Sequence, residues 1–130
     1  MKGWEKILVL LGRIFLCQIF LVSGINKILH FAQTQQYMAS FGMPATGLFA
    51  LGALVFEIIG ALSILLGYKG RFGALLLIIF LIPTSLIFHT NFSDRLQLIM
   101  FMKNLAILGG LVEIVARGTG PLSIDSLQSS

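Results

Sequence analysis

The chain has 130 residues, of which 57% are hydrophobic and only 11% are charged. A soluble domain usually carries about a quarter of its residues as Asp, Glu, Lys or Arg, and a small domain has a large surface to cover relative to its volume. The composition therefore excludes a water-soluble globule, a disordered chain and a multi-domain enzyme. It predicts a single integral membrane domain over residues 1–130.

Four apolar segments are long enough to cross a bilayer as helices, since a span needs about 20 residues. They cover residues 7–29, 47–66, 72–89 and 96–116. The stretch 30–46 is polar and broken by Gly and Pro, which are expected to stop any helix there. Shorter turns follow at 67–70 and 91–95, and residues 117–130 form a polar tail. Because lipid offers no partners to the backbone, the predicted fold class is an all-α, four-helix membrane bundle.

An alternative for the start of the chain is a cleaved signal peptide ending near Ser23 and Gly24. Arg13 splits the apolar core that such a peptide would need, and the apolar run continues to Leu29. A first membrane span is therefore favoured over a signal peptide.

Basic residues near the span ends predict the orientation, because Lys and Arg gather on the cytoplasmic side. With four spans, five of them fall on one side: Lys2, Lys6, Lys69, Arg71 and Arg117. Only Lys27 and Arg95 fall on the other. Both termini are therefore expected in the cytoplasm. This distribution accounts for the net charge of +4, and without a basic cluster no nucleic-acid partner is predicted.

The single cysteine, Cys17, excludes an intramolecular disulfide, a thiolate cluster and a Cys-x-x-Cys pair. It is interpreted as a small buried apolar residue. His30 and His89 end the first and third spans, but no spacing pairs them as metal ligands. No metal site is predicted.

Ionisable residues within spans are the main candidates for function, since placing one there costs about 2.5–3.5 kcal/mol. At 100° per residue they share helix faces with small residues, which let membrane helices approach closely. These faces are Arg13, Cys17, Phe20, Gly24 and Lys27; Ala53, Glu57, Gly60, Ile64 and Gly67; and Lys103, Ala106, Gly110, Glu113 and Arg117. Glu57 is expected to face the bundle interior and to meet Arg13, Lys27 or Lys103.

Three interpretations of these groups stay open. A buried ion pair can specify how helices are arranged without adding stability. The same groups can line a polar cavity for a ligand, an ion or a proton. They can also form a contact surface for a partner protein.

A set of polar, aromatic and glycine residues, in a fixed order along the whole chain, closely resembles the DoxX family of small four-helix bacterial membrane proteins. The set is Arg13, Phe20, Ser23, Gly24, Lys27, Tyr37, Gly42, Pro44, Glu57, Gly67, Lys69, Arg71, His89, Phe101, Lys103, Asn104, Gly109, Gly110, Gly118, Gly120, Pro121, Ser123 and Asp125. The resemblance implies a multi-pass protein of the bacterial inner membrane.

The resemblance implies little about chemistry. The family name comes from a subunit of a thiosulfate:quinone oxidoreductase, and some members are thought to join membrane oxidoreductase complexes linked to thiol and oxidative stress. Most members have no established activity. The family offers no agreed catalytic residue, so the catalytic residues stay unknown and whether the chain is an enzyme stays open.

The resulting functional prediction is a redox-associated membrane subunit, linked to quinone or thiol chemistry, that binds a small ligand between helices. The candidate ligand-binding residues are Arg13, Lys27, Glu57, His89, Lys103 and Asn104. Quinone carbonyls need hydrogen-bond donors at membrane depth, which Lys103 and Asn104 are expected to supply. No resident cofactor other than a quinone is considered, and electrons would come from an oxidoreductase partner.

Two alternatives belong to other classes. One is a small proton-coupled transporter, in the form of a homodimer, that uses Glu57 as its coupling carboxylate. The other is a non-catalytic assembly or scaffold protein whose partners are lipid and other membrane proteins. A flavin or haem spectrum in the purified complex would favour the redox subunit, and proton-dependent uptake into vesicles would favour the transporter.

Overall fold

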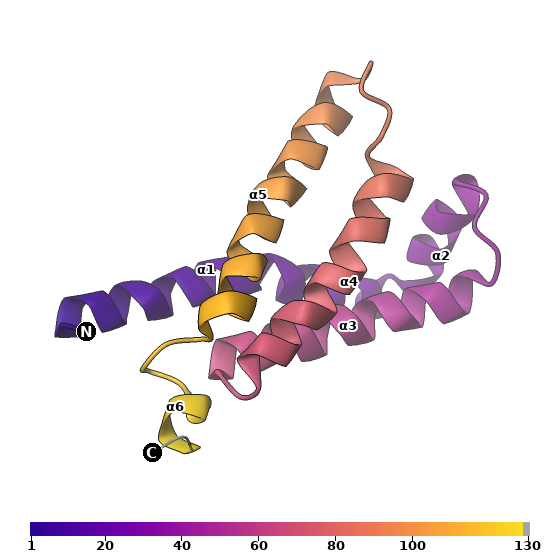
Figure 1. The fold of residues 1–130 in the computed structure, drawn as a ribbon. Helices are drawn as coiled ribbons and strands as arrows, with labels where there is room; N and C mark the ends of the chain where they lie inside the picture. Colours follow the sequence, from indigo (N-terminus) through magenta and orange to yellow (C-terminus); the bar gives the residue numbers. More distant parts are fainter. Residues whose placement is uncertain (129–130) are drawn as a thin grey trace.

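A computed structural model describes residues 1–128, which fold into six α-helices joined by short loops. The helices are α1 (Gly3–Leu29), α2 (Phe31–Ser40), α3 (Thr46–Leu66), α4 (Gly70–Phe88), α5 (Arg95–Arg117) and α6 (Ile124–Gln128) (Figure 1). Four of them, α1, α3, α4 and α5, are long and apolar enough to cross a membrane. The predicted all-α class and its four spanning helices are confirmed.

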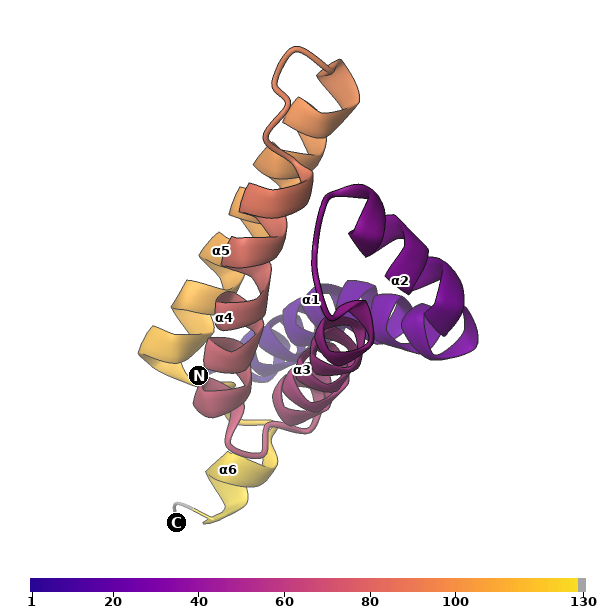
Figure 2. The ribbon, with the colours of Figure 1, turned by 90° about the vertical axis from the view of Figure 1, so that its right-hand side faces the viewer.

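The four long helices form two crossing pairs. Helix α3 packs against α1 and α4, and α4 packs against α5. In both ribbon views α4 and α5 run side by side and lean away from α1 and α3 (Figures 1 and 2). The α3–α4 turn and α6 lie in the half of the molecule that holds the N-terminus, whereas α2 and the α4–α5 loop lie in the other half.

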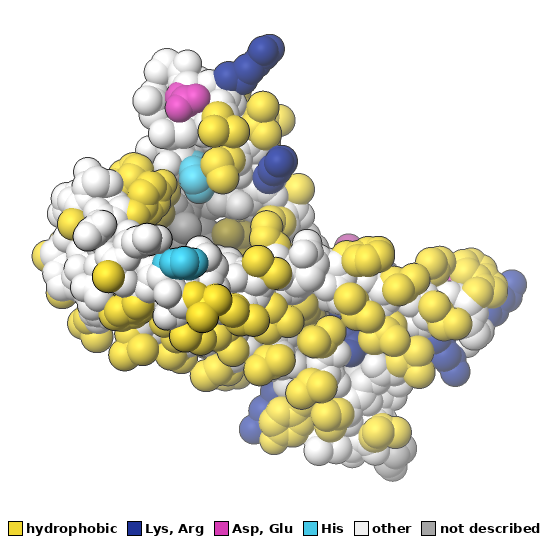
Figure 3. Space-filling model, turned by 180° about the vertical axis from the view of Figure 1, so that it is seen from behind, with side chains coloured by type: hydrophobic (Ala, Val, Ile, Leu, Met, Phe, Trp, Pro, Cys, Tyr) yellow, Lys and Arg dark blue, Asp and Glu magenta, His cyan; other side chains and the backbone are white. Residues whose placement is uncertain are grey.

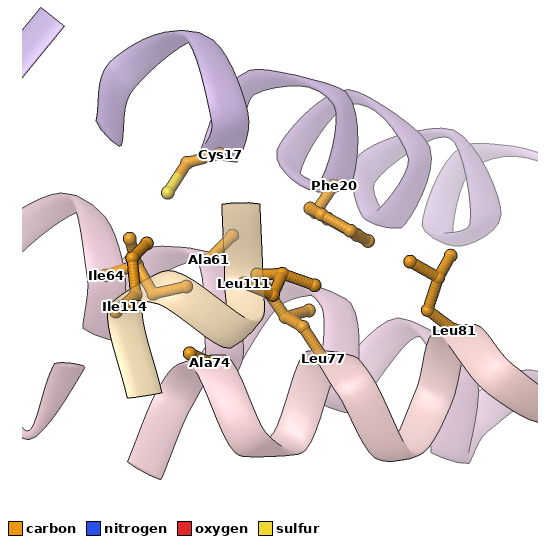
Figure 4. Close-up of a cluster of buried hydrophobic side chains, with 9 residues drawn as sticks. All are labelled: Cys17, Phe20, Ala61, Ile64, Ala74, Leu77, Leu81, Leu111 and Ile114. Atoms are coloured by element: carbon orange, nitrogen blue, oxygen red, sulfur yellow. The ribbon is translucent and has the colours of Figure 1, made fainter. Parts of the chain in front are cut away.

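The apolar core lies where these pairs cross. Its buried side chains come from all four long helices and point toward one another (Figure 4). They are Cys17, Phe20, Ala61, Ile64, Ala74, Leu77, Leu81, Leu111 and Ile114. The interpretation of Cys17 as a packed apolar residue agrees with its complete burial. Hydrophobic side chains cover much of the face shown in Figure 3, and most of the Lys and Arg side chains on it lie toward its edges.

Glycines set how closely α3 and α4 approach. A Cβ added at Gly73 would lie 2.5 Å from the Ser63 Cβ and 2.9 Å from the Gly60 carbonyl oxygen. A Cβ at Gly60 would lie 3.0 Å from the carbonyl oxygen of Gly73. The two backbones therefore touch at this point, as small residues allow in membrane helix pairs.

The expectation that no helix forms in residues 30–46 is wrong, because α2 occupies most of this stretch. Phe31 and Met38 lie two helical turns apart and pack into a second apolar cluster with Ala50, Ala53 and Phe88. Seven residues correspond to nearly two full turns, so both side chains fall on one face. Helix α2 is therefore amphipathic, with its apolar face packed on the bundle.

The tail also proves to be structured. Asp125 accepts hydrogen bonds from the backbone N–H groups of Lys69 (2.7 Å) and Gly70 (2.9 Å), which begin α4. Its own N–H donates to the Gly67 carbonyl at 2.7 Å. A Cβ at Gly67 would lie 2.2 Å from the Cβ of Ser123, so the tail fits only against glycine. The tail therefore caps the first turn of α4, where N–H groups have no partner within the helix.

Candidate ligand-binding cavity

A cavity of about 1060 Å³ lies between α1, α2, α3 and α4, and α5 contributes Asn104 and Ile107 to its wall. Its surface is mainly apolar, with polar groups from α1, α3, α4 and α5 spaced along it. The hollow opens between the two histidines, as Figure 3 shows. Its size is at the upper end of the range of about 300–1,000 Å³ typical of small-molecule sites.

An ion pair forms the charged part of the cavity wall. Lys27 Nζ lies 2.6 Å from Glu57 Oε1, and the Glu57 side chain is 2% exposed. Lys27 also donates to Ser23 Oγ at 2.8 Å and lies 5.8 Å from the ring centroid of Phe80. The prediction that Glu57 faces the interior and meets a basic side chain is confirmed, and the cation is Lys27.

The approach of α1 to α3 brings this pair together. A Cβ at Gly24 would lie 2.6 Å from Ile58 Cγ1, so the helices touch one turn before Lys27. Ser23 precedes Lys27 by four residues and therefore lies on the same face of α1. The faces predicted for α1 and α3 are confirmed, since Arg13, Cys17, Phe20 and Gly24 are buried, as are their α3 counterparts.

A second polar group is the amide of Asn104. Its Nδ2 donates to Ser85 Oγ at 2.9 Å, and Ser85 in turn donates to the Leu81 carbonyl at 2.8 Å. An amide has two N–H groups and one carbonyl oxygen. Within residues 1–128 the remaining N–H and the oxygen make no hydrogen bond. Asn104 can therefore both donate to and accept from a molecule in the cavity.

The histidines lie at the mouth of the cavity. His89 follows the last residue of α4, and its Nδ1 is buried with no hydrogen-bond partner in the described chain. His30 is exposed at the junction of α1 and α2. A buried polar atom without a partner costs free energy unless water or a ligand pairs with it. His89 is therefore a candidate contact for a polar group.

Helix α2 covers one side of the cavity. The ring of Tyr37 stacks on that of Phe88 with centroids 5.3 Å apart, and Phe41 meets Phe88 edge-on at 4.8 Å. Met38 is buried below them. These aromatic contacts hold α2 against the end of α4, so the cavity lies between the spans and an amphipathic cover.

Arg13 does not reach the cavity. Its guanidinium donates to the carbonyls of Ile64 (3.1 Å) and Leu65 (2.7 Å) in the last turn of α3. It also donates to the carbonyls of Thr119 (2.9 Å) and Leu122 (2.7 Å) in the tail. Arg13 therefore binds the C-terminal carbonyls of α3, where a cation is favoured, and joins the tail to the bundle.

Lys103 does not line the cavity either, so the structure brings only four of the six candidate ligand-binding residues together there: Lys27, Glu57, His89 and Asn104. Lys103 is exposed, and so are Glu113 and Arg117 on the same face of α5. Helix α5 buries Leu111 and Ile114 instead. At a rise of 1.5 Å per residue, Lys103 lies about 12 Å along α5 from Arg95, the first residue of the helix. A long side chain can extend from this position toward the headgroups.

Sequence reasoning did not assign Ser85 and Tyr37 to the site. Ser85 is an isolated hydroxyl in an apolar span, and no sequence spacing relates it to Asn104 on another helix. Tyr37 belongs to the helix that the sequence did not predict. The position of Ser23 could be predicted, because a residue four positions before Lys27 lies on the same face of the helix.

The crossing apolar helices, the charged ends and the buried ion pair define a multi-pass membrane protein with a cavity between its spans. The DoxX family model matches residues 8–90. The chain belongs to the DoxX family.

Two relatives extend this match over nearly the whole chain. The inner membrane protein YqjF of Escherichia coli K12 is 39% identical over 127 residues, which cover 98% of this chain and 96% of the relative. The inner membrane protein YphA of the same organism is 36% identical over 126 residues, covering 93% and 90%. No solved structure matches the chain. Its location is the bacterial inner membrane, as expected.

Residues 1–128 contain no group of three or more His, Cys, Asp or Glu side chains placed to hold a metal ion. The donor set does suit a quinone, which carries two carbonyl oxygens on an apolar ring. Among the described residues 1–128, Asn104 has an unused N–H, Lys27 has a third N–H beyond its two polar partners, and His89 Nδ1 has no hydrogen-bond partner. The apolar wall suits the ring.

Proposed function

We propose that this chain is a redox-associated membrane subunit that binds a quinone-like ligand in the cavity between its spans. The observation that carries the proposal is the composition of the cavity wall. A mainly apolar surface carries polar groups, among them Lys27, Glu57, His89 and Asn104, which is typical of small-molecule sites.

Each polar group has a role in this proposal. Asn104 donates to one carbonyl oxygen of the ligand and is oriented for this by Ser85. Lys27 provides a positive charge, held in place by Glu57 and Ser23, toward which electron-rich oxygens are drawn. Glu57 offsets the cost of keeping that charge at membrane depth. The chain binds and orients the ligand, and a partner oxidoreductase supplies the electrons.

Entry from the membrane is compatible with the fold. Exposed apolar side chains such as Ile19, Phe49 and Ile79 line the cavity, and Pro83 in its wall interrupts the hydrogen bonding of α4. A proline cannot donate to the carbonyl four residues before it. The half of α4 that contains Pro83 is therefore less constrained than its first half, which touches α3 at Gly73. An apolar ligand dissolved in lipid can reach the cavity without crossing the aqueous phase.

The test is quinone binding to the purified protein in lipid nanodiscs, measured by isothermal titration with a short-chain benzoquinone and a short-chain naphthoquinone. Asn104→Leu should weaken binding about tenfold, since it removes one hydrogen bond of about 1.4 kcal/mol. Lys103→Leu is the matched control, because it changes the adjacent residue, whose side chain lies outside the cavity. Equal binding by wild type and Asn104→Leu would refute the proposed site.

The rival function, proton-coupled transport through Glu57, makes a different prediction. It expects Glu57→Gln to abolish proton flux in proteoliposomes driven by a pH gradient. The quinone proposal expects no such flux in the wild type. A proton flux that depends on Glu57 would favour the transporter.

A further inference from the structure

A second hollow, of about 870 Å³, lies at the opposite end of the bundle from the cavity mouth. Three segments meet there: the start of α4, the end of α5 and the tail that follows α5. Three basic side chains line it, Lys69, Arg71 and Arg117. We name these three residues the basic cradle.

The charge of the basic cradle is only partly neutralised within the chain. Arg71 makes no hydrogen bond or ion pair in residues 1–128, and Lys69 Nζ contacts only the ring of Tyr68, at 5.6 Å. Arg117 forms a loose pair with Glu113, at 3.5 Å, with both side chains mostly exposed. Such surface pairs contribute little. Asp125 also lines the hollow, but its carboxylate accepts two backbone N–H groups of α4.

The backbone around the basic cradle is fixed by contacts described above. Asp125 joins the tail to the start of α4, and Arg13 joins the tail to the end of α3. Gly118, with φ of +79°, lets the Arg71 side chain lie close, since a Cβ there would be 3.3 Å from Arg71 Nε. The backbone segments that carry the three cations are therefore held in fixed positions relative to one another.

The position of the basic cradle indicates a lipid. It lies at the start of span α4 and the end of span α5, which places it near the lipid headgroups when these helices cross a bilayer. Phe72, 58% exposed, lines the hollow, and Leu75, 44% exposed, follows one turn later on the same face of α4. An acyl chain can follow this apolar face while its headgroup meets the cations. Basic pockets at span ends bind anionic lipid headgroups in this way.

We infer that the basic cradle binds the phosphate of an anionic phospholipid such as phosphatidylglycerol or cardiolipin. Arg71 and Arg117 would hold the phosphate oxygens, because a guanidinium can donate two parallel hydrogen bonds to a phosphate. Phe72 and Leu75 would contact the first part of an acyl chain. This site is separate from the cavity and does not depend on the function proposed for it.

The test is native mass spectrometry of the full chain in detergent with phosphatidylglycerol, phosphatidylcholine or inorganic phosphate added. Wild type should retain phosphatidylglycerol in preference to phosphatidylcholine with the same acyl chains. Arg71→Gln with Arg117→Gln should weaken this binding about twenty-five-fold, since each basic residue near an anionic lipid contributes roughly fivefold. Arg95→Gln, at the other end of α5, is the matched control and should leave binding unchanged.

A variant with lysine at both arginine positions keeps the charge and guards against loss of folding. It should bind more tightly than the glutamine variant and less tightly than wild type, because lysine lacks the paired donors of a guanidinium. Unchanged binding in the glutamine variant would overturn the inference. So would equal retention of phosphatidylcholine. Binding of inorganic phosphate as tight as that of the lipid would also overturn it, by assigning the site to free phosphate.

Discussion

The ion pair between Lys27 and Glu57 should behave as one unit in stability measurements. Glu57→Met removes the carboxylate and leaves Lys27 charged, 18% exposed and held only by Ser23 and the Phe80 ring. Lys27→Met leaves a carboxylate that is 2% exposed with no cation. The double variant replaces both charges with apolar side chains of similar length.

The burial of each partner sets the expected magnitudes. Breaking a buried pair by removing one partner costs about 3–5 kcal/mol, because the other charge is left uncompensated. The cost of Glu57→Met should lie near the lower end of this range, since the Lys27 side chain is 18% exposed. Lys27→Met should fall near the upper end, since Glu57 has almost none. The double variant should lie within about 1 kcal/mol of wild type, so the coupling free energy should be about 7 kcal/mol, close to the whole cost of the two single variants.

Reversible unfolding in mixed micelles with increasing SDS, followed by circular dichroism, measures these differences. Lys103→Met combined with Glu57→Met is the control cycle, because Lys103 is exposed and makes no ion pair with Glu57. That control should retain the whole cost of Glu57→Met. Additive costs for Lys27 and Glu57, with coupling below about 0.5 kcal/mol, would refute the reasoning.

Three further predictions concern the fold. In the same unfolding assay, Gly73→Val should destabilise the bundle by about 1–3 kcal/mol through overpacking, because its Cβ would lie 2.5 Å from the Ser63 side chain of α3. Gly109→Ala is the control and should be neutral or stabilising, because a Cβ there would meet no described atom within 4 Å. Arg13→Leu should lower the free energy of unfolding by about 3 kcal/mol, because it leaves buried carbonyls without a hydrogen-bond donor. Limited proteolysis should then cut the tail, and an intact tail would contradict the role given to Arg13. In a background without the native cysteine, a membrane-impermeant thiol reagent should label Gln36→Cys and not Lys2→Cys in intact cells, and the reverse pattern would disprove cytoplasmic termini.

The buried faces of α1 and α3 could be predicted from the sequence because one physical cost determines them. A charge within a span must face inward or reach the surface, and around Glu57 small residues mark the inward face. The same reasoning failed for α5. Lys103 is exposed, and a long side chain in such a position can extend toward the membrane surface; its spacing from Ala106 and Gly110 does not distinguish the two solutions.

Other features depended on contacts between distant residues. Arg13 bonds to four carbonyls, and a carbonyl is present at every position, so no residue type marks its partners. Asp125 caps α4 from a position 55 residues away in the chain. Helix α2 was not predicted because many of its residues are polar and its apolar face is short. The family resemblance implied the architecture without supplying these contacts.

The cavity between the spans is proposed to bind a quinone-like ligand. The most direct test is photolabelling with an azidoquinone in membranes, followed by mass spectrometric mapping of the labelled residues. Label should appear on cavity residues of α2 and α4, around Tyr37 and Thr84, and should fall when unmodified quinone competes or when Asn104 is changed to leucine. Label that lies on the exposed face of α5 around Lys103, or that neither competition nor Asn104→Leu reduces, would contradict the claim.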